Sequence, residues 1–202
     1  RVIDVFRPLW WIILNLIILS FRPSKTGQAY KRIWHPIKGS PLKYLTTKQS
    51  KKLTEKFKIF KIVQIDYAMR YGNPSIRSRL DNLFNLGCTK ILIMPLYPQY
   101  SASTTATVLD EVHKWMLNKR WQPSLRTVPP WYDNKDYIQS ICNSINKSFK
   151  KNGEPETLLI SFHGVPKRYL ILGDPYHCHC QKTARLIEEN LKWPQKNIFV
   201  TF

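Results

Sequence analysis

The stretch KILIMPLYPQYSASTTATVLDEVHKW, residues 90–115, decides the expected fold because it passes from strand to loop to helix. Its beginning, Lys90 to Pro95, is a short apolar run of the kind found in buried strands. Leu96 to Ser103 make a polar and aromatic loop, and a helix is predicted from Thr104 to about Lys119. Such a unit is typical of α/β proteins, in which functional groups gather where strands end.

The same alternation continues on both sides of this stretch. Apolar, β-prone residues 59–67 predict an earlier strand, and in the loop after it Asn73 is placed as a helix N-cap with Pro74 at the first helical position. That helix is expected to run to about Leu86, where Gly87 closes it in the left-handed conformation. Further strands are predicted at 124–128, 157–162 and 197–202, and further helices at 134–151, before Gly153, and at about 181–191.

Strands that alternate with helices predict parallel sheets with helices on both faces, which is the α/β doubly wound architecture. The polar break Glu154-Pro155-Glu156 follows one predicted helix and precedes a buried strand. We therefore place a domain boundary there, which divides the sequence into residues 1–153 and 154–202.

The composition is that of a globular protein with a strongly basic surface. Hydrophobic residues make up 43% of the 202 residues, and the formal net charge is +19. The basic residues are spread along the chain without an arginine-rich tail or a nucleic-acid-binding motif, so no nucleic-acid partner is expected and much of the charge is assigned to a solvated surface. The four cysteines, without a secretory signal, indicate a cytoplasmic protein.

One strongly apolar segment, Leu9 to Phe21, has the sequence LWWIILNLIILSF. A membrane-spanning helix needs about 20 such residues, so no transmembrane helix is predicted here. The tryptophans, the central Asn15 and the flanking Arg7 and Arg22 suit a segment that lies in a bilayer interface or at the mouth of an apolar ligand site. An ordinary buried helix fits the same residues equally well.

The loop from Met94 to Thr105 combines two tyrosines, Tyr97 and Tyr100, with a run of hydroxyl groups before a helix start. The hydroxyl residues are Ser101, Ser103, Thr104 and Thr105. Backbone amides at a helix start and hydroxyl donors can hold a carboxylate or phosphate, and tyrosine rings offer flat apolar faces to an aromatic ligand. On these residues alone, a plain capping loop is the simpler interpretation.

His163 ends an apolar strand and is followed by Gly164, so its imidazole is expected to project from the sheet edge into a crevice shared with Tyr97. Imidazole titrates near neutral pH and binds divalent iron, so the residue suits a proton acceptor or a metal ligand. A structural histidine is the more common alternative.

The segment His177, Cys178, His179 and Cys180 has the residue types of a metal site, but its adjacent positions lack the two-residue gap of ordinary zinc sites. A helix-capping loop is the preferred interpretation. The sequence also contains no phosphate-binding G-x-x-x-x-G-K-[ST] loop, no G-x-S-x-G motif and no G-x-G-x-x-G turn, so the commonest α/β enzymes lose support.

Several of these segments resemble the ferrochelatase family, in the order in which that family has them. The most specific are LLISFHGVP at 158–166 and GDPY at 173–176, and the others are LYPQYSASTT at 96–105, RVID with RPLWW at 1–11, Tyr30-Lys31 and GSPL at 39–42. The segment GDPYHCHCQKT, residues 173–183, resembles the sequences of bacterial members of the family, particularly alphaproteobacterial ones. The resemblance implies two Rossmann-like α/β domains with a porphyrin between them, and a lyase that inserts ferrous iron into protoporphyrin IX to form protoheme.

The resemblance also implies roles for individual residues. His163 matches the family's histidine at the metal site and is the expected catalytic base and iron ligand. The positions that match porphyrin-binding residues are Arg22, Tyr30, Ser40, Arg70, Tyr97, Ser101, Ser103 and Thr104. Leu9 to Phe21 matches the lip that touches porphyrin and membrane, so a protein peripheral to the inner membrane is expected.

Two family features do not occur in the sequence: the glycine-rich first strand, expected before Arg1, and the acidic residue opposite the histidine, expected after Phe202. The sequence is therefore expected to be a ferrochelatase fragment without both ends, which does not metallate porphyrin by itself. No cofactor is assigned, and nothing here supports an iron–sulfur cluster, whose cysteines are largely C-terminal in the family. Two alternatives stay open, a chelatase for another tetrapyrrole or metal and a non-catalytic module that binds porphyrin or membrane.

Overall fold

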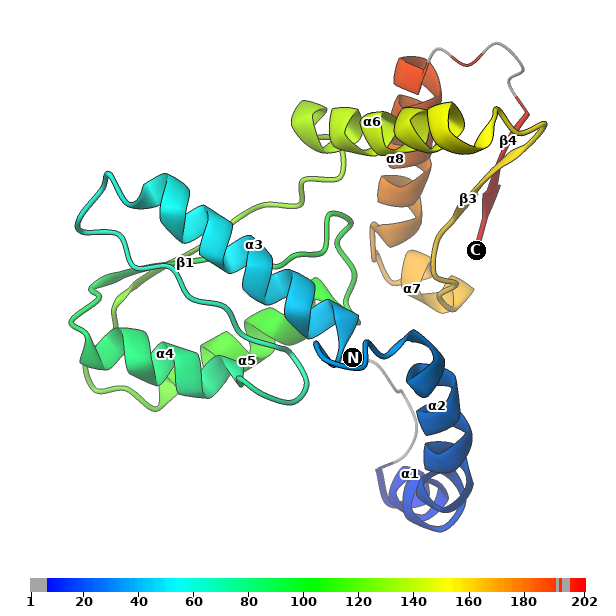
Figure 1. Cartoon of the computed structure of the whole chain (residues 1–202). Helices are drawn as coiled ribbons and strands as arrows, with labels where there is room; N and C mark the ends of the chain where they lie inside the picture. Colours follow the sequence, from blue (N-terminus) through cyan, green and yellow to red (C-terminus); the bar gives the residue numbers. More distant parts are fainter. Residues whose placement is uncertain (1–6, 192, 194–196) are drawn as a thin grey trace. The chain divides into compact units, whose positions relative to one another are not determined.

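The computed structural model describes residues 7–191, 193 and 197–202, without the side chains of residues 7, 9, 10, 17, 20–22, 24 and 25. Helices dominate its first part, and helices alternate with short strands from residue 90 onward (Figure 1). In chain order the elements are α1 (Arg7–Ile12), the π-helix η1 (Ile13–Ile18), α2 (Leu19–Ile33), α3 (Pro41–Phe57), α4 (Ile76–Asn85), β1 (Lys90–Ile93), α5 (Thr105–Leu117), β2 (Ser124–Thr127), α6 (Lys135–Asn152), β3 (Leu158–Ser161), α7 (Lys167–Ile171), α8 (Tyr176–Leu191) and β4 (Ile198–Thr201).

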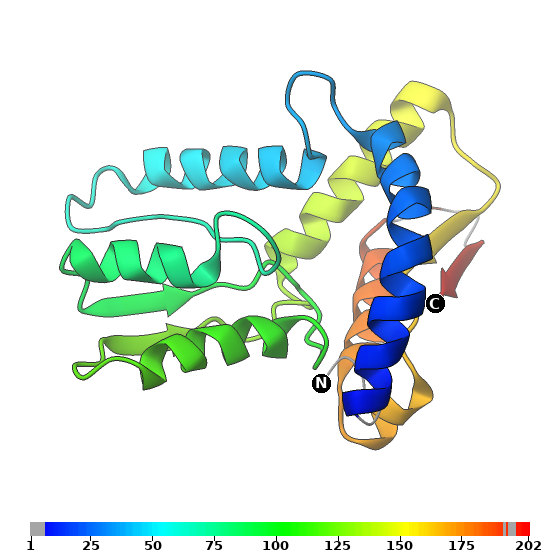
Figure 2. The same cartoon turned by 90° about the horizontal axis from the view of Figure 1, so that it is seen from below.

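The strands of the described residues form two parallel pairs. β1 pairs with β2, with Lys90 opposite Ser124, and β3 pairs with β4, with Leu158 opposite Ile198. Figure 2 shows the two strands of each pair side by side. Parallel neighbours need a long crossover, which α5 provides in the first pair, and α7 with α8 in the second. The expected α/β class, with parallel strands and flanking helices, is confirmed.

The chain divides into two compact units. Unit 1 comprises residues 1–89 and 111–123, and unit 2 comprises residues 90–110 and 124–202. Unit 2 therefore contains both strand pairs together with α6 and α8. The domain boundary expected between residues 153 and 154 stays a prediction.

The core of unit 2 forms where α6 crosses α8 (Figure 1). Its buried members come from both helices and from the residue just beyond α8, and they are Ile138, Cys142, Ile187, Leu191 and Trp193. Leu158 and Ile160 of β3 and Ile198 of β4 pack against this cluster. The buried positions of α6 recur at helical spacing, because only one face of the helix meets its neighbours.

Most of the helices and strands predicted from residue 87 onward are confirmed to within a few residues. Gly87 and Gly153 follow the helices that they were expected to end, with positive φ angles of 81° and 88° that favour glycine. Asn134 caps α6, since its side chain accepts a hydrogen bond of 3.1 Å from the amide of Tyr137. These features are local, and the sequence therefore predicts them well.

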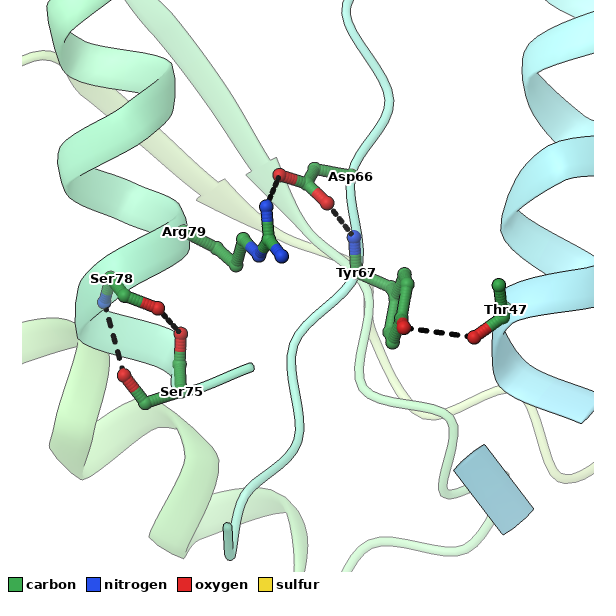
Figure 3. Close-up of polar contacts among 6 residues, drawn as sticks. All are labelled: Thr47, Asp66, Tyr67, Ser75, Ser78 and Arg79. Carbon is green, nitrogen blue, oxygen red and sulfur yellow. Dashed lines mark hydrogen bonds and ion pairs between the residues drawn. The ribbon is translucent and has the colours of Figure 1, made fainter. Parts of the chain in front are cut away.

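The strand expected at residues 59–67 is wrong. The chain turns after α3, where the Val63 amide donates to the Phe60 carbonyl at 3.0 Å, and within the described part of the chain residues 64–68 belong to no helix or strand. Side chains hold this segment instead (Figure 3): the hydroxyls of Tyr67 and of Thr47 in α3 are hydrogen-bonded at 2.8 Å, and Asp66 lies 3.4 Å from Arg79 of α4. A β-prone segment becomes a strand only when a neighbouring backbone supplies its hydrogen bonds.

The start of α4 also differs from the prediction. Its N-cap is Ser75 and not Asn73, because the Ser75 hydroxyl accepts a hydrogen bond of 3.2 Å from the amide of Ser78 (Figure 3). The Ser78 hydroxyl in turn donates to the Ser75 carbonyl at 2.9 Å. The helix therefore begins at Ile76, two residues after the expected Pro74.

Candidate functional site

Two loops of unit 2 are hydrogen-bonded to residues of α8. The hydroxyl loop, residues 96–104, follows β1, and the histidine loop, residues 162–175, follows β3 and leads into α8. Both loops follow strands of parallel pairs, which is where α/β proteins place functional groups. They correspond to the two segments that the sequence singled out.

Three residues of α8 and its surroundings hold the hydroxyl loop in place. Gln99 donates a side-chain hydrogen bond of 3.0 Å to the Thr183 hydroxyl. The amide of Tyr100 donates to Nδ1 of His179 at 3.2 Å, and the ring of Tyr132 stacks on the same imidazole with centroids 3.7 Å apart. His179 is thus half-buried and acts as a hydrogen-bond acceptor for the loop.

Asp174 joins the hydroxyl loop to the start of α8. Asp174 is 9% exposed, and its Oδ2 accepts hydrogen bonds from the amide of Ala102 at 2.7 Å and from the hydroxyl of Ser101 at 3.0 Å. Its Oδ1 accepts from the amide of Tyr176 at 3.0 Å. Asp174 thus lies two residues before Tyr176, the first residue of α8, and its carboxylate satisfies one of the amides at the start of that helix. One buried carboxylate therefore fixes both segments.

Asp174 is the residue that our sequence analysis did not select. Its signal was present as Gly173-Asp174-Pro175, since glycine ends α7 with a φ of 88° and an Asp-Pro pair is typical of a helix start. Its contact with Ser101 and Ala102 joins positions more than 70 residues apart. No local pattern predicts such a contact.

His163 lies two residues beyond the end of β3, close to the strand end at which the sequence placed it. Its amide donates a hydrogen bond of 3.2 Å to the Tyr176 hydroxyl, and its side chain is exposed. The next residue, Gly164, lies close to the backbone of Phe202, since a Cβ at Gly164 would be 3.4 Å from the Phe202 carbonyl carbon. The imidazole is therefore accessible at a strand end, whereas the crevice shared with Tyr97 stays a prediction.

Tyr176, which contacts His163, and Cys180, which contacts Tyr176, both remain protonated near neutral pH. Burial and the hydrogen bond with the Cys180 thiol raise the pKa of Tyr176 to about 12. Burial raises the pKa of Cys180 to about 11. Neither group therefore supplies a base or a thiolate at neutral pH.

The segment His177 to Cys180 is helical, and the capping loop expected there is wrong. α8 begins at Tyr176 and not near Gln181, because Asp174 and Pro175 start the helix earlier. Successive helix residues point in different directions, so Cys180 is buried while His177 stacks on Phe202 at 4.9 Å. Among the described residues, no group of three or more His, Cys, Asp or Glu side chains is placed to hold a metal ion.

Arg70 belongs to unit 1. Its guanidinium lies 3.7 Å from a carboxylate oxygen of Glu111 and 4.6 Å above the ring of Tyr71. Within the described part of the chain, its buried Nε has no hydrogen-bond partner. Its role at a porphyrin stays a prediction.

The other expected substrate-binding residues have different surroundings. Ser40 caps α3, accepting a hydrogen bond of 3.4 Å from the amide of Lys43, and Tyr30 is exposed on α2. Tyr97 is 38% exposed in the hydroxyl loop. The side chain of Arg22 lies outside the described residues. The candidates thus fall in both units, and their binding roles stay predictions.

The apolar segment Leu9 to Phe21 is helical and crosses from α1 through η1 into α2. Its described large side chains include several exposed ones, with Trp11 65% and Leu16 67% exposed. Asn15 donates a hydrogen bond of 2.8 Å to the Trp11 carbonyl. No helix among the described residues has the length and hydropathy to cross a membrane.

The parallel strand pairs, their flanking helices and the loops beyond the strands define an α/β protein with its polar groups at strand ends. The family model Ferrochelatase matches residues 1–202, and the chain belongs to this family.

Individual relatives agree with this assignment. A protein of Allorhizobium ampelinum named Ferrochelatase is 50% identical over 204 residues, which cover 100% of this chain and 59% of that protein. Another of that name, from Francisella tularensis subsp. novicida, is 50% identical over 200 residues, which cover 98% of this chain and 59% of the relative. The chain thus spans about 59% of the length of these relatives.

Proposed function

We propose that this chain takes part in the insertion of ferrous iron into protoporphyrin IX, which forms protoheme. The family assignment supports this activity, and the observation that carries it to particular residues is the exposed imidazole of His163 at the end of β3. The hydroxyl loop, which is held by Asp174 and α8 in the same unit, supplies polar groups for the substrate.

In the proposed reaction two pyrrole N–H bonds break, four Fe–N bonds form and two protons are released, without a change in the oxidation state of iron. Both protons must leave the macrocycle. Neutral imidazole accepts one proton and can also coordinate the incoming iron, so His163 is proposed as base and iron ligand. Tyr176 and Cys180 do not compete for this role, because their raised pKa values keep both protonated.

The helical segment from Leu9 to Phe21 is proposed to contact the apolar substrate or a membrane surface. Its exposed Trp11, Leu16 and Leu19 suit burial in either environment. The corresponding location is the cytoplasm, with peripheral binding to the inner membrane.

The test is an anaerobic iron-insertion assay on two proteins. The first is the 202-residue chain, and the second is a hybrid in which this chain replaces the matching segment of the Allorhizobium ampelinum relative. Loss of porphyrin fluorescence and gain of haem absorbance report insertion, and fluorescence titration reports porphyrin binding. We expect the hybrid to form haem.

In the hybrid, His163→Ala should lower the insertion rate at least 100-fold with less than a twofold change in porphyrin affinity, because removal of a base affects the reaction and leaves the apolar contacts in place. His113→Ala, an exposed position on α5, serves as the matched control. An active hybrid whose rate survives His163→Ala would contradict the role of His163. Porphyrin binding without insertion would instead support a non-catalytic module.

A further inference from the structure

The backbone amides around the start of α5 are already hydrogen-bonded within the protein. The amides of Thr104 and Ala106 both donate to the Ser101 carbonyl at 3.2 Å, and that of Thr107 donates to the Thr104 carbonyl at 3.1 Å. A helix start binds an external anion through amides that have no partner. This one has few donors of that kind to offer a substrate.

Two further donors of the loop converge on an internal carboxylate. The Ala102 amide and the Ser101 hydroxyl both reach Oδ2 of Asp174, and Ser101 is 1% exposed. An amide and a hydroxyl directed at one oxygen are the donors that an anion-binding loop presents to its ligand. Asp174 therefore occupies the position that an external carboxylate would take.

The protons of the serine hydroxyls can be assigned from these contacts. Ser101 has one hydroxyl proton, which it donates to Asp174, so it must accept in its 3.0 Å contact with the Ser103 hydroxyl. Ser103 is then the donor in that contact, and its amide also donates to Ser101 at 3.2 Å. Both serine protons are directed into the protein.

Thr104 differs from its neighbours. Its hydroxyl makes only a long contact of 3.5 Å, to the Ser101 carbonyl, and the residue is partly buried. The Thr107 hydroxyl, by comparison, donates at 2.8 Å to the Thr104 carbonyl. The Thr105 hydroxyl has no partner within the described part of the chain, but its oxygen is buried and does not reach an external ligand. Of Ser101, Ser103 and Thr104, it is therefore Thr104 that can redirect its proton to a ligand at the lowest cost.

We propose that Asp174 is a positioning residue whose carboxylate is the resident anion of the hydroxyl loop, and that Thr104 is the hydroxyl that donates to a carboxylate of the substrate. The second half rests on the proposed function. The first half rests only on the contacts among Asp174, Ser101 and Ala102, and it is tested without a porphyrin.

The first experiment replaces the carboxylate chemically in the 202-residue chain. Asp174→Ala should lower the melting temperature, and 50 mM sodium formate should restore at least half of the loss, whereas sodium chloride at equal concentration should not. The double variant Asp174→Ala with Ser101→Ala should gain less than half as much from formate, because one of the two donors is gone. An unchanged melting temperature, or equal responses to formate and chloride, would overturn the resident-anion role.

If Asp174→Ala does not fold, Asp174→Asn decides the same question. It keeps the size of the side chain and removes its charge. We expect hydrogen exchange at the Ala102 amide to become at least tenfold faster, with unchanged exchange in the α6 core. Unaltered exchange at Ala102 would show that the charge of Asp174 does not hold the loop.

The second experiment compares protoporphyrin IX, which has two free carboxylates, with its dimethyl ester. Thr104→Val should weaken binding of the diacid five- to tenfold and of the diester less than twofold. Thr54→Val is the matched control. The Thr54 hydroxyl also donates to a backbone carbonyl, that of Ser50 at 3.0 Å, and it lies at an exposed position of α3. An equal effect on both porphyrins, or none on either, would overturn the role of Thr104.

In the same titration, the direction in which Asp174→Asn changes the affinity for the diacid tests the role of Asp174. If the carboxylate merely repelled a bound propionate, its neutralisation would strengthen diacid binding. A positioning role predicts weaker diacid binding, by about tenfold. Tighter binding would contradict the proposal. Should the unchanged chain bind neither porphyrin, the proposed function and the role of Thr104 fail together, while the formate experiment still decides the role of Asp174.

Discussion

The amide of Tyr100 donates a hydrogen bond to Nδ1 of His179, 79 positions further along the chain, at 3.2 Å. An imidazole accepts at Nδ1 only when that nitrogen carries no proton. Burial also lowers the pKa of His179, although Asp133 and Asp174 oppose this effect. The neutral ring is therefore the form that holds the hydroxyl loop.

This relationship predicts a loss of stability in mild acid. Above pH 6.5 the ring is neutral in both states, and the contribution of His179 to the free energy of unfolding is fully present. Below pH 6.5 the unfolded chain takes up a proton that the folded chain resists, so this contribution falls until the pH reaches the lowered folded pKa. Urea unfolding at pH 7.5 and 5.5 measures the difference.

His179→Asn should reduce that pH dependence, because the amide oxygen retains an acceptor near the position of Nδ1 and does not titrate. His113→Asn, at an exposed position, should leave it unchanged. Equal pH dependence of the unchanged chain and His179→Asn would rule out His179 as its source.

Asp81 should contribute to the stability of unit 1. Its Oδ1 accepts hydrogen bonds from Lys119 at 2.7 Å and from the indole of Trp115 at 2.8 Å, and these bonds lower the pKa of Asp81. Because the carboxylate is 39% exposed, we expect Asp81→Asn to cost only about 1 kcal/mol at pH 7. The cost should disappear as the pH falls through the folded pKa, since the native carboxyl is then neutral too.

Chemical denaturation at pH 7 and pH 3 measures this effect. Glu188→Gln, an exposed carboxylate on α8, is the control and should cost less than about 0.5 kcal/mol. A cost of Asp81→Asn that is the same at both pH values would contradict the assigned cause.

Ile187 should be a principal contributor to the core between α6 and α8. It is 3% exposed, and truncation of a buried isoleucine typically costs about 2–5 kcal/mol because it removes buried surface and leaves a cavity. Ile187→Ala is compared with Ile171→Ala, whose side chain on α7 is 73% exposed. Similar losses for the two variants in urea unfolding would show that the α6–α8 contact is not the core of unit 2.

The apolar segment of α1 and η1 should carry membrane binding. The double variant Trp11→Ser with Leu16→Ser removes two exposed apolar side chains, each worth roughly 1.5–3 kcal/mol if fully buried in lipid. We expect at least a tenfold loss of binding to anionic vesicles in a flotation assay. Leu117→Ser, which is 80% exposed on α5, is the control, and equal losses would count against a dedicated segment.

The elements that the sequence predicted are those whose signals are local. Gly87 and Gly153 end helices, Asn134 caps α6, and the apolar runs at Lys90 and Leu158 begin strands of parallel pairs. The segment 59–67 had an equally clear local pattern and did not form a strand, because strand formation depends on a second backbone that local sequence does not specify.

For the candidate site, the sequence by itself determined the α/β class, the family, and the position of His163 at a strand end, since each depends on residue order along one segment. Only the tertiary structure decided that Asp174 meets Ser101 and Ala102, that His179 is an internal acceptor, and that the hydroxyl protons of Ser101 and Ser103 are directed inward. Those facts depend on how α8 packs against a loop more than 70 residues before it. Packing of this kind arises from many weak contacts at once and leaves no periodic signal in the chain.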